Sequence, residues 1–275
     1  RLDSTKRASK ASRGGLFVGM LIDTHAHVNF AAFKEDNDEV IRRALGNDIW
    51  MINVGSQIDT SRRAVEIAQK YRKGVFAAVG LHPIHLQKME VKEQVDPDES
   101  FKFISRVEVF DKEKYCELAD GLKVVAIGET GLDYFHIKGD EAEQKRIKNL
   151  QKKTFIQELE LASELDKPVI VHCREAHKDL LEILTEQKQH LKNLRGVVHS
   201  FSGRLSQAQQ YFELGFLISF NGLITFARDY DKVILNSPSE KILIETDCPY
   251  LTPIPYRGKR NEPSYVKYVA QKIAE

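Results

Sequence analysis

Eight short runs of apolar and β-branched residues recur along the chain, and charged stretches with helical spacing separate them. The runs cover residues 21–27, 49–55, 74–82, 123–129, 168–174, 196–201, 215–220 and 241–247. The helical stretches include Asp59–Tyr71, Glu141–Leu165, Ala176–His190 and Ser206–Leu214. Continuously apolar strands that alternate with amphipathic helices are typical of a parallel sheet covered by helices. Eight such units predict an α/β fold in which the sheet closes into a (β/α)8 barrel.

A doubly wound open sheet is the alternative architecture for alternating strands and helices. Such sheets rarely need eight units, and no G-x-G-x-x-G sequence follows the first run. The chain has 275 residues, and barrels of about 250 residues are common as single domains. We therefore expect a single TIM-like barrel domain over residues 20–275.

Three segments depart from the regular repeat. Residues 1–19 begin with a basic stretch, so we expect a flexible basic arm or a remnant of cloning, with a transit peptide as the alternative. Residues 84–121 are longer than one barrel helix requires and contain the helix-breaking sequence D-P-D. We expect a loop with one or two helices there, over the carboxyl-terminal face of the barrel. The chain stops inside a helix predicted to begin near Pro263, so we expect the C-terminus to be incomplete.

The composition is that of an ordinary globular protein. Apolar residues make up 42% and charged residues 29%, and no stretch approaches the roughly 20 apolar residues that span a membrane. The net charge of +1 argues against a protein that wraps nucleic acid with its whole surface, but not against a local basic patch. Three cysteines without a C-x-x-C pair make a poor disulfide framework. We therefore expect a reducing compartment, the cytoplasm or the nucleus. We also expect a monomer without an obligate protein partner.

Histidines and carboxylates gather where the predicted strands end. These residues are His25, His27, Glu129, His172, His199, Glu245 and Asp247. Strand side chains alternate with period two, so His25 and His27 point to the same side and can converge on one ion. Imidazole and carboxylate groups together are typical ligands of zinc and other transition metals. Because active sites of such barrels lie at the carboxyl ends of the strands, the pattern predicts a metal site there.

The set is larger than one ion needs, and it suits two ions about 3.5–4 Å apart. We predict that the first ion is held by His25, His27, Glu129 and Asp247. His172 and His199 would hold the second ion together with Glu129, which bridges the pair. The other histidines lie in helical or loop contexts, where an ordinary hydrogen-bonded side chain is the simpler interpretation; they are His85, His136, His177 and His190.

Four further residues are candidates for substrate binding. Arg174 lies two residues after His172, so both side chains point to the same face of the strand. A guanidinium group can bind a phosphate with two hydrogen bonds. His82 ends the third run and could donate a hydrogen bond to the same group. Arg257 and Arg260 alternate with tyrosines in the loop after the last run, a pattern suited to single-stranded nucleic acid. An ordinary solvated, proline-rich connection is the alternative interpretation of that loop.

Seven segments resemble, in order, the sequence motifs of the TatD family of metal-dependent deoxyribonucleases, which belong to the amidohydrolase-like metal-dependent hydrolase barrels. The segments are LIDTHAH (21–27), GLHP (80–83), VVAIGETGLDY (124–134), PVIVHCREAH (168–177), VVHSFSG (197–203), IETDCPYL (244–251) and RNEP (260–263). The resemblance implies a TIM-like barrel, a divalent metal centre and hydrolysis of DNA phosphodiester bonds. The metal ligands that it implies coincide with those drawn from the strand ends: His25, His27, Glu129, His172, His199 and Asp247.

On this basis we expect a deoxyribonuclease that acts on single-stranded DNA ends, as an exonuclease does, in DNA repair or degradation. Two divalent ions would lower the pKa of a water molecule that attacks phosphorus. Asp247 and Glu129 are the predicted catalytic residues, with Asp247 as both ligand and proton acceptor, and Arg174 would offset charge on the phosphoryl oxygens. The resemblance implies Mg²⁺ for activity, whereas imidazole-rich ligation favours Zn²⁺, Mn²⁺ or Fe.

Three other functions compete with this one. An amidohydrolase acting on a cyclic amide, ester or lactone would use the same ligands, but such barrels commonly bridge their metals with a modified lysine where this chain has Glu129. A non-catalytic barrel that had lost its site would lack ligands, and none of the expected ones is missing. A glycosidase with Glu129 and Asp247 as paired carboxylates would not explain four converging histidines.

Overall fold

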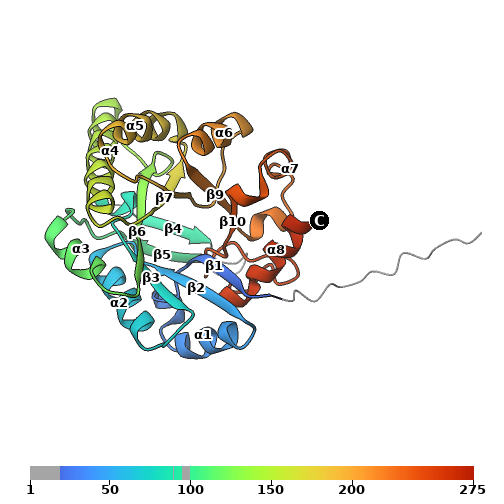
Figure 1. Ribbon diagram of the computed structural model, residues 1–275. Helices are drawn as coiled ribbons and strands as arrows, with labels where there is room; N and C mark the ends of the chain where they lie inside the picture. The colour runs from blue at the N-terminus through green and yellow to red at the C-terminus, as the bar shows by residue number, and fades with distance from the viewer. Residues whose placement is uncertain (1–18, 89, 95–99) are drawn as a thin grey trace, which may run out of the picture.

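Eight parallel strands form a sheet that curls into a nearly closed barrel (Figure 1). The computed structural model describes residues 19–88, 90–94 and 100–275. In sheet order the strands are β1 (Leu21–Ala26), β2 (Ile49–Val54), β3 (Val75–Val79), β6 (Val124–Asp133), β7 (Val169–Arg174), β8 (Gly196–Val198), β9 (Phe216–Phe220) and β10 (Ile242–Ile244). Beyond β10 the chain reaches β1, where Asp247 N–H donates to His25 O at 2.8 Å. The predicted single-domain (β/α)8 barrel is confirmed.

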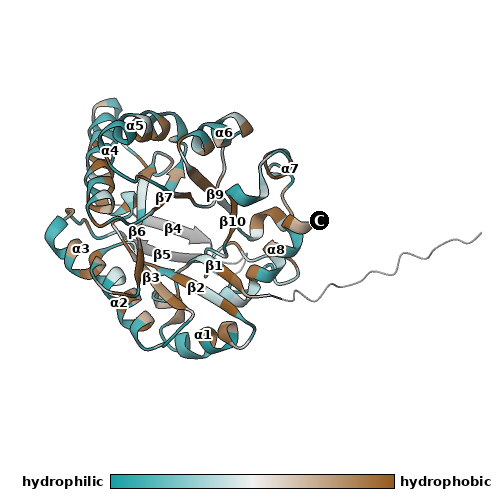
Figure 2. Cartoon of the chain, viewed as in Figure 1, coloured by the Kyte–Doolittle hydropathy of each residue, from teal (hydrophilic) through white to brown (hydrophobic). Residues whose placement is uncertain are grey.

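Helices surround the barrel, and Figure 2 shows apolar strands inside a ring of helices with largely hydrophilic outer faces. The helices are α1 (Asn37–Leu45), α2 (Ile58–Gln69), α3 (Lys112–Ala119), α4 (Glu141–Glu164), α5 (His177–His190), α6 (Leu205–Glu213), α7 (Asp231–Leu235) and α8 (Val266–Ala274). Short 3-10 helices are η1 (Ala31–Phe33), η2 (Pro83–Leu86), η3 (Gly222–Thr225), η4 (Ser239–Lys241) and η5 (Pro263–Tyr265). The four helices predicted from spacing are present, with ends within two residues of those expected.

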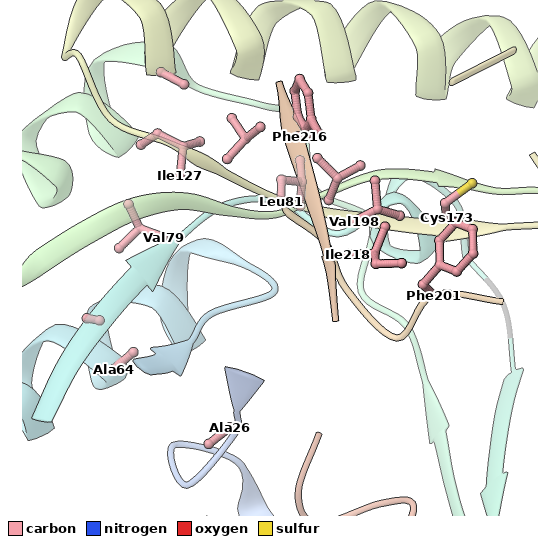
Figure 3. Packing of buried hydrophobic residues seen from close by; sticks show 14 of the residues in the cluster. Ala26, Ala64, Val79, Leu81, Ile127, Cys173, Val198, Phe201, Phe216 and Ile218 are labelled. Carbon is pink, nitrogen blue, oxygen red and sulfur yellow. The ribbon is translucent and has the colours of Figure 1, made fainter. Parts of the chain in front are cut away.

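The apolar core has two layers, because strand side chains alternate between the two faces of the sheet. The larger layer lies between strands and helices and includes Val198, Phe216 and Ile218 (Figure 3). The smaller layer fills the inside of the barrel with side chains such as Ala78 and Ile170. A filled barrel leaves room for chemistry only at its ends.

In the part of residues 84–121 that the structure describes, an α-helix is present as expected, but a β-hairpin lies where a loop was expected. After η2, β4 (Glu90–Gln94) and β5 (Ser100–Ile104) pair antiparallel, and α3 follows. The sequence prediction missed the period-two alternation in SFKFI, which is typical of strands, and EVKEQ shows no such alternation. At the base of the hairpin, the side chain of Gln57 donates to Arg106 O at 3.0 Å, just beyond the carboxyl end of β2. Figure 1 shows the hairpin drawn across the centre of the barrel.

Within the described part of the chain, no helix is long and apolar enough to cross a membrane. The predicted basic arm lies outside the described residues, except for Gly19, and so does the D-P-D sequence at 96–98. The last helix, α8, packs against η3 and β1 and covers the seam where the two ends of the sheet meet.

Candidate metal centre

The structure brings the six predicted metal ligands together at the carboxyl-terminal end of the barrel. They come from β1 and its end (His25, His27), β6 (Glu129), β7 (His172) and the segments after β8 (His199) and β10 (Asp247). None of these side chains is more than 16% exposed. So many buried polar groups at one place need partners of opposite charge, because an unpaired buried charge is strongly destabilising.

Glu129 lies in the middle of its strand, which corrects the prediction that it ends one. The β6–β7 register shifts between Ile127 and Thr130, and the intervening Gly128 has a φ of 152°. A side chain would not fit at Gly128, where a Cβ would lie 2.7 Å from Ile170 O. This irregularity re-aims the glutamate without ending the strand. The four additional residues of β6 bring Asp133 to the centre.

One group of ligand atoms contains two imidazoles and two carboxylates. His25 Nε2 and His27 Nε2 lie 3.0 Å apart. Glu129 Oε2 is 3.5 Å from His25 Nε2, and Asp247 Oδ1 is 3.4 Å from His27 Nε2. Two nitrogens and two carboxylate oxygens that converge in this way form a donor set for a divalent cation.

The second group surrounds the other oxygen of the same glutamate. Glu129 Oε1 lies 2.8 Å from His199 Nε2, 3.0 Å from His172 Nδ1 and 3.2 Å from His82 Nε2. Each carboxylate oxygen of Glu129 therefore faces a different set of imidazoles. This is the arrangement of a carboxylate that bridges two sites.

Hydrogen-bond partners outside the cluster define which ring nitrogens carry protons. His27 Nδ1 lies 2.9 Å from Val54 O, and His172 Nε2 lies 3.1 Å from Asp133 Oδ2. A carbonyl or ionised carboxylate only accepts, so these nitrogens donate, and in the neutral form of each ring the other nitrogen turns a lone pair toward the cluster. Metal-binding histidines are usually held in this way by an acceptor behind the ring. His199 Nδ1 lies 3.6 Å from Glu245 Oε1, close enough for electrostatic attraction but too far for a hydrogen bond.

His82 has the opposite arrangement. Ile84 N–H donates to His82 Nδ1 at 3.1 Å, so the proton of the neutral ring is on Nε2, the atom that faces Glu129. A protonated nitrogen cannot bind a metal. Although its distances would allow His82 to share an ion with Glu129 and His172, its hydrogen bond suits it to be a donor.

The electrostatics of the centre favour an added positive charge. Burial alone would raise the pKa of Glu129, but His82, His199 and His172 hold that pKa well below its usual value. Burial would lower the pKa of His199, yet Glu129 and Glu245 raise it well above its usual value. Burial and the charge of His199 lower the pKa of His25. The carboxylates are thus ionised, and a bound metal ion would displace protons from the imidazoles that have raised pKa values.

Two carboxylates that support the histidines were not assigned this role from the sequence. Asp133 contacts His172 and also His136 Nδ1, at 2.8 Å. Glu245 accepts hydrogen bonds from Ser200 N–H at 2.7 Å and Ser219 Oγ at 2.5 Å. The spacing Glu129-x-Gly131-x-Asp133 has the strand period and could have revealed the first of them. In the described residues, none of His85, His136, His177 and His190 belongs to a group that could hold a metal ion.

The arginines predicted to bind substrate differ in their surroundings. The guanidinium carbon of Arg174 lies 3.8 Å from the ring centre of Phe135, and that of Arg257 lies 4.1 Å from the ring centre of Phe226. Both arginines are exposed. Arg260 instead forms an ion pair with Asp36 and donates to a backbone carbonyl of η1. Its guanidinium is therefore engaged inside the protein.

Comparison with known proteins agrees with this geometry. The family model described as TatD related DNase matches residues 22–275, which is nearly the whole chain. The chain belongs to the TatD family.

Similar proteins cover almost the same length. The chain is 39% identical to the uncharacterized metal-dependent hydrolase YabD of Bacillus subtilis, over 93% of this chain and 91% of that protein. It is 33% identical to the uncharacterized metal-dependent hydrolase YcfH of Escherichia coli, over 92% and 87%. The crystal structure of YjjV, a TatD homolog from Escherichia coli, superposes with a TM-score of 0.75 at 29% identity, over 92% and 89%. The chain is therefore a metal-dependent hydrolase.

Proposed function

We propose that this TatD-family hydrolase is a deoxyribonuclease that cleaves phosphodiester bonds near the ends of single-stranded DNA. The observation that carries the proposal is the position of Glu129, whose two carboxylate oxygens face two separate sets of imidazole nitrogens. Paired metal sites bridged in this way suit phosphoryl transfer, where both the attacking and the leaving oxygen need stabilisation. The description of the family model points to the same reaction.

The proposed ligands of the first ion are His25, His27, Glu129 and Asp247, and those of the second are Glu129, His172 and His199. The converging lone pairs and the ionised carboxylates fit divalent cations. When bound, the ions would lower the pKa of the attacking water and offset charge on the phosphate. Imidazole-rich donor sets favour Zn²⁺, Mn²⁺ or Fe, and Mg²⁺ is the further candidate for turnover.

The protein's own groups account for the remaining steps. His27, His25 and His199 keep the pKa of Asp247 below its usual value despite burial, so this carboxylate is ionised and can take the proton of the attacking water. The water oxygen bonds to phosphorus, the ester bond to the leaving oxygen breaks, and that oxygen takes up a proton from solvent. His82 Nε2–H would donate to a phosphoryl oxygen, and Arg174 would bind another oxygen of the substrate.

The test uses chelator-treated protein reloaded with Mg²⁺, Mn²⁺ or Zn²⁺ and an end-labelled single-stranded oligonucleotide. We expect progressive shortening from one end, and a loss of at least about 100-fold in rate for Glu129→Gln, because it removes the bridging charge. His190→Asn, on the exposed end of α5, is the matched control. A lactone and a dihydropyrimidine are assayed in parallel. Hydrolysis of only these small molecules, or full activity of Glu129→Gln, would contradict the proposal.

A further inference from the structure

An exposed aromatic ring lies beside the metal centre. Phe135 lies two residues past the end of β6 and is 51% exposed, which is unusual for a phenylalanine. The guanidinium of Arg174 covers it at 3.8 Å, and the ring of His136 meets it at 89°, with centroids 5.0 Å apart. Arg174 lies opposite Asp133 in the β6–β7 ladder. Arg174 at the end of β7 and Phe135 just past the end of β6 thus lie at the carboxyl ends of two adjacent strands, the end of the barrel that holds the candidate ligands.

The turn that carries Phe135 is fixed by the carboxylate that also orients His172. Asp133 accepts from His136 N–H at 3.0 Å and contacts His172 Nε2 at 3.1 Å. Tyr134 N–H donates to Arg174 O at 2.9 Å, which extends the β6–β7 ladder past the end of β6. The ring and the guanidinium are therefore held in place before any substrate arrives, and binding would cost little ordering entropy.

We propose that Phe135 and Arg174 form a nucleotide subsite, in which the unpaired base next to the scissile phosphate stacks on this pair. The N–H groups of Arg174 bind the adjoining phosphate. Aromatic rings and guanidinium planes hold single-stranded nucleic acid through stacking, without selecting a sequence. A base inside a duplex is already stacked on its neighbours, so the subsite selects an unpaired end. The inference rests on the proposed deoxyribonuclease function and specifies which part of the DNA the protein recognises.

The first measurement compares two single-stranded oligonucleotides that differ only by an abasic residue beside the cleaved bond. We expect the wild-type protein to prefer the normal strand by about fivefold or more in kcat/KM, because stacking of one base contributes at least this factor. In Phe135→Leu the ratio of kcat/KM for the normal strand to kcat/KM for the abasic strand falls toward one, and Phe135→Trp restores the wild-type ratio. Phe76→Leu is the control, because Phe76 lies near the start of β3 under Lys123, at the opposite end of the barrel.

The second measurement is binding of a fluorescent single-stranded oligonucleotide by anisotropy, with chelator present so that no cleavage occurs. We expect weaker binding by Phe135→Leu. Arg174→Gln should reduce the slope of log Kd against log salt concentration by the amount that one phosphate contact contributes.

The outcomes separate the two proposals. If the wild-type protein cleaves DNA and Phe135→Leu keeps the preference for the normal strand, the subsite is overturned and the nuclease function stands. If Phe135→Leu loses kcat/KM equally on the normal and the abasic oligonucleotide, the subsite is also overturned, because such a loss indicates a structural role of the ring. If binding depends on Phe135 but no metal supports cleavage, the subsite stands and the deoxyribonuclease function is overturned. Absence of any oligonucleotide binding overturns both.

Discussion

Glu158 is a fully buried carboxyl group on α4 that joins this helix to β6 and to the segment after β3, next to the metal centre. Its Oε1 accepts from Leu81 N–H at 2.8 Å, and its Oε2 accepts from Thr130 Oγ1 at 2.5 Å. Leu81 precedes His82, and Thr130 follows Glu129. Burial raises the pKa of Glu158 to about 8, although both hydrogen bonds act in the opposite direction. At neutral pH this group is therefore largely protonated in the folded protein.

This raised pKa makes stability depend on pH. The unfolded chain releases the proton near pH 4.5, whereas the folded chain keeps it until about pH 8. The stabilisation is complete below the lower value and is lost as pH rises through the higher one. One pKa unit corresponds to about 1.4 kcal/mol, so Glu158 alone should reduce the free energy of unfolding by about 2–3 kcal/mol between pH 6 and pH 8. Glu158→Gln keeps the shape and an acceptor for Leu81 N–H but cannot ionise, so it should lack this loss.

The assay is thermal unfolding at pH 6 and pH 8, followed by circular dichroism. The wild-type Tm should fall by about 4–8 °C more than that of Glu158→Gln over this interval. Other titrating groups contribute to both proteins and cancel in the comparison. Glu160→Gln makes the same chemical change at an exposed position of α4 and should keep the wild-type pH dependence. An equal fall in Tm for wild type and Glu158→Gln would refute the reasoning, because the buried carboxyl would then ionise normally.

Asp133→Asn should weaken zinc binding about 10- to 100-fold in calorimetry, because His172 loses an ionised acceptor behind its ring. Unchanged affinity would show that this contact does not support a ligand. Adding Mn²⁺ or Zn²⁺ at about 100 times its Kd to chelator-treated protein should raise the free energy of unfolding by about 2.7 kcal/mol, measured as a higher Tm that excess chelator reverses. Arg43→Ala should lower the free energy of unfolding by about 1 kcal/mol in urea titrations, since the buried Glu262 loses a partner at 2.7 Å. Breaking the exposed pair Arg146–Glu143 by Arg146→Ala should leave the urea midpoint unchanged.

The periodicity of the sequence was sufficient to predict the barrel and most of the candidate centre. Apolar runs of strand length, separated by helical spacing, admit few architectures other than a parallel sheet covered by helices. The residues at the strand ends meet on one face of such a barrel, whatever the details of packing, because all strands are parallel. For this reason His25, His172 and His199 could be grouped, although the first and last are far apart in the chain.

Local pattern was less informative where the backbone departs from regular geometry. β6 continues four residues past Glu129, and no periodicity in the sequence marks the register shift beside Gly128. The hairpin of β4 and β5 was missed because both strands are short and the first, EVKEQ, is mostly charged and polar, which is typical of a solvated segment.

The sequence by itself determined the fold class and the identity of the groups that could hold metal ions. Only the tertiary structure decided what each group does there. In the folded protein Asp133 contacts His172 on the side away from the cluster, and the hydrogen bond to His82 Nδ1 makes the other ring nitrogen a donor. Arg260 forms an ion pair with Asp36, whereas Arg174 is exposed and packs on Phe135. The physical reason is that these roles depend on contacts between distant segments. Asp36 and Arg260 are 224 residues apart, and the local sequence around either residue does not indicate that the two form an ion pair.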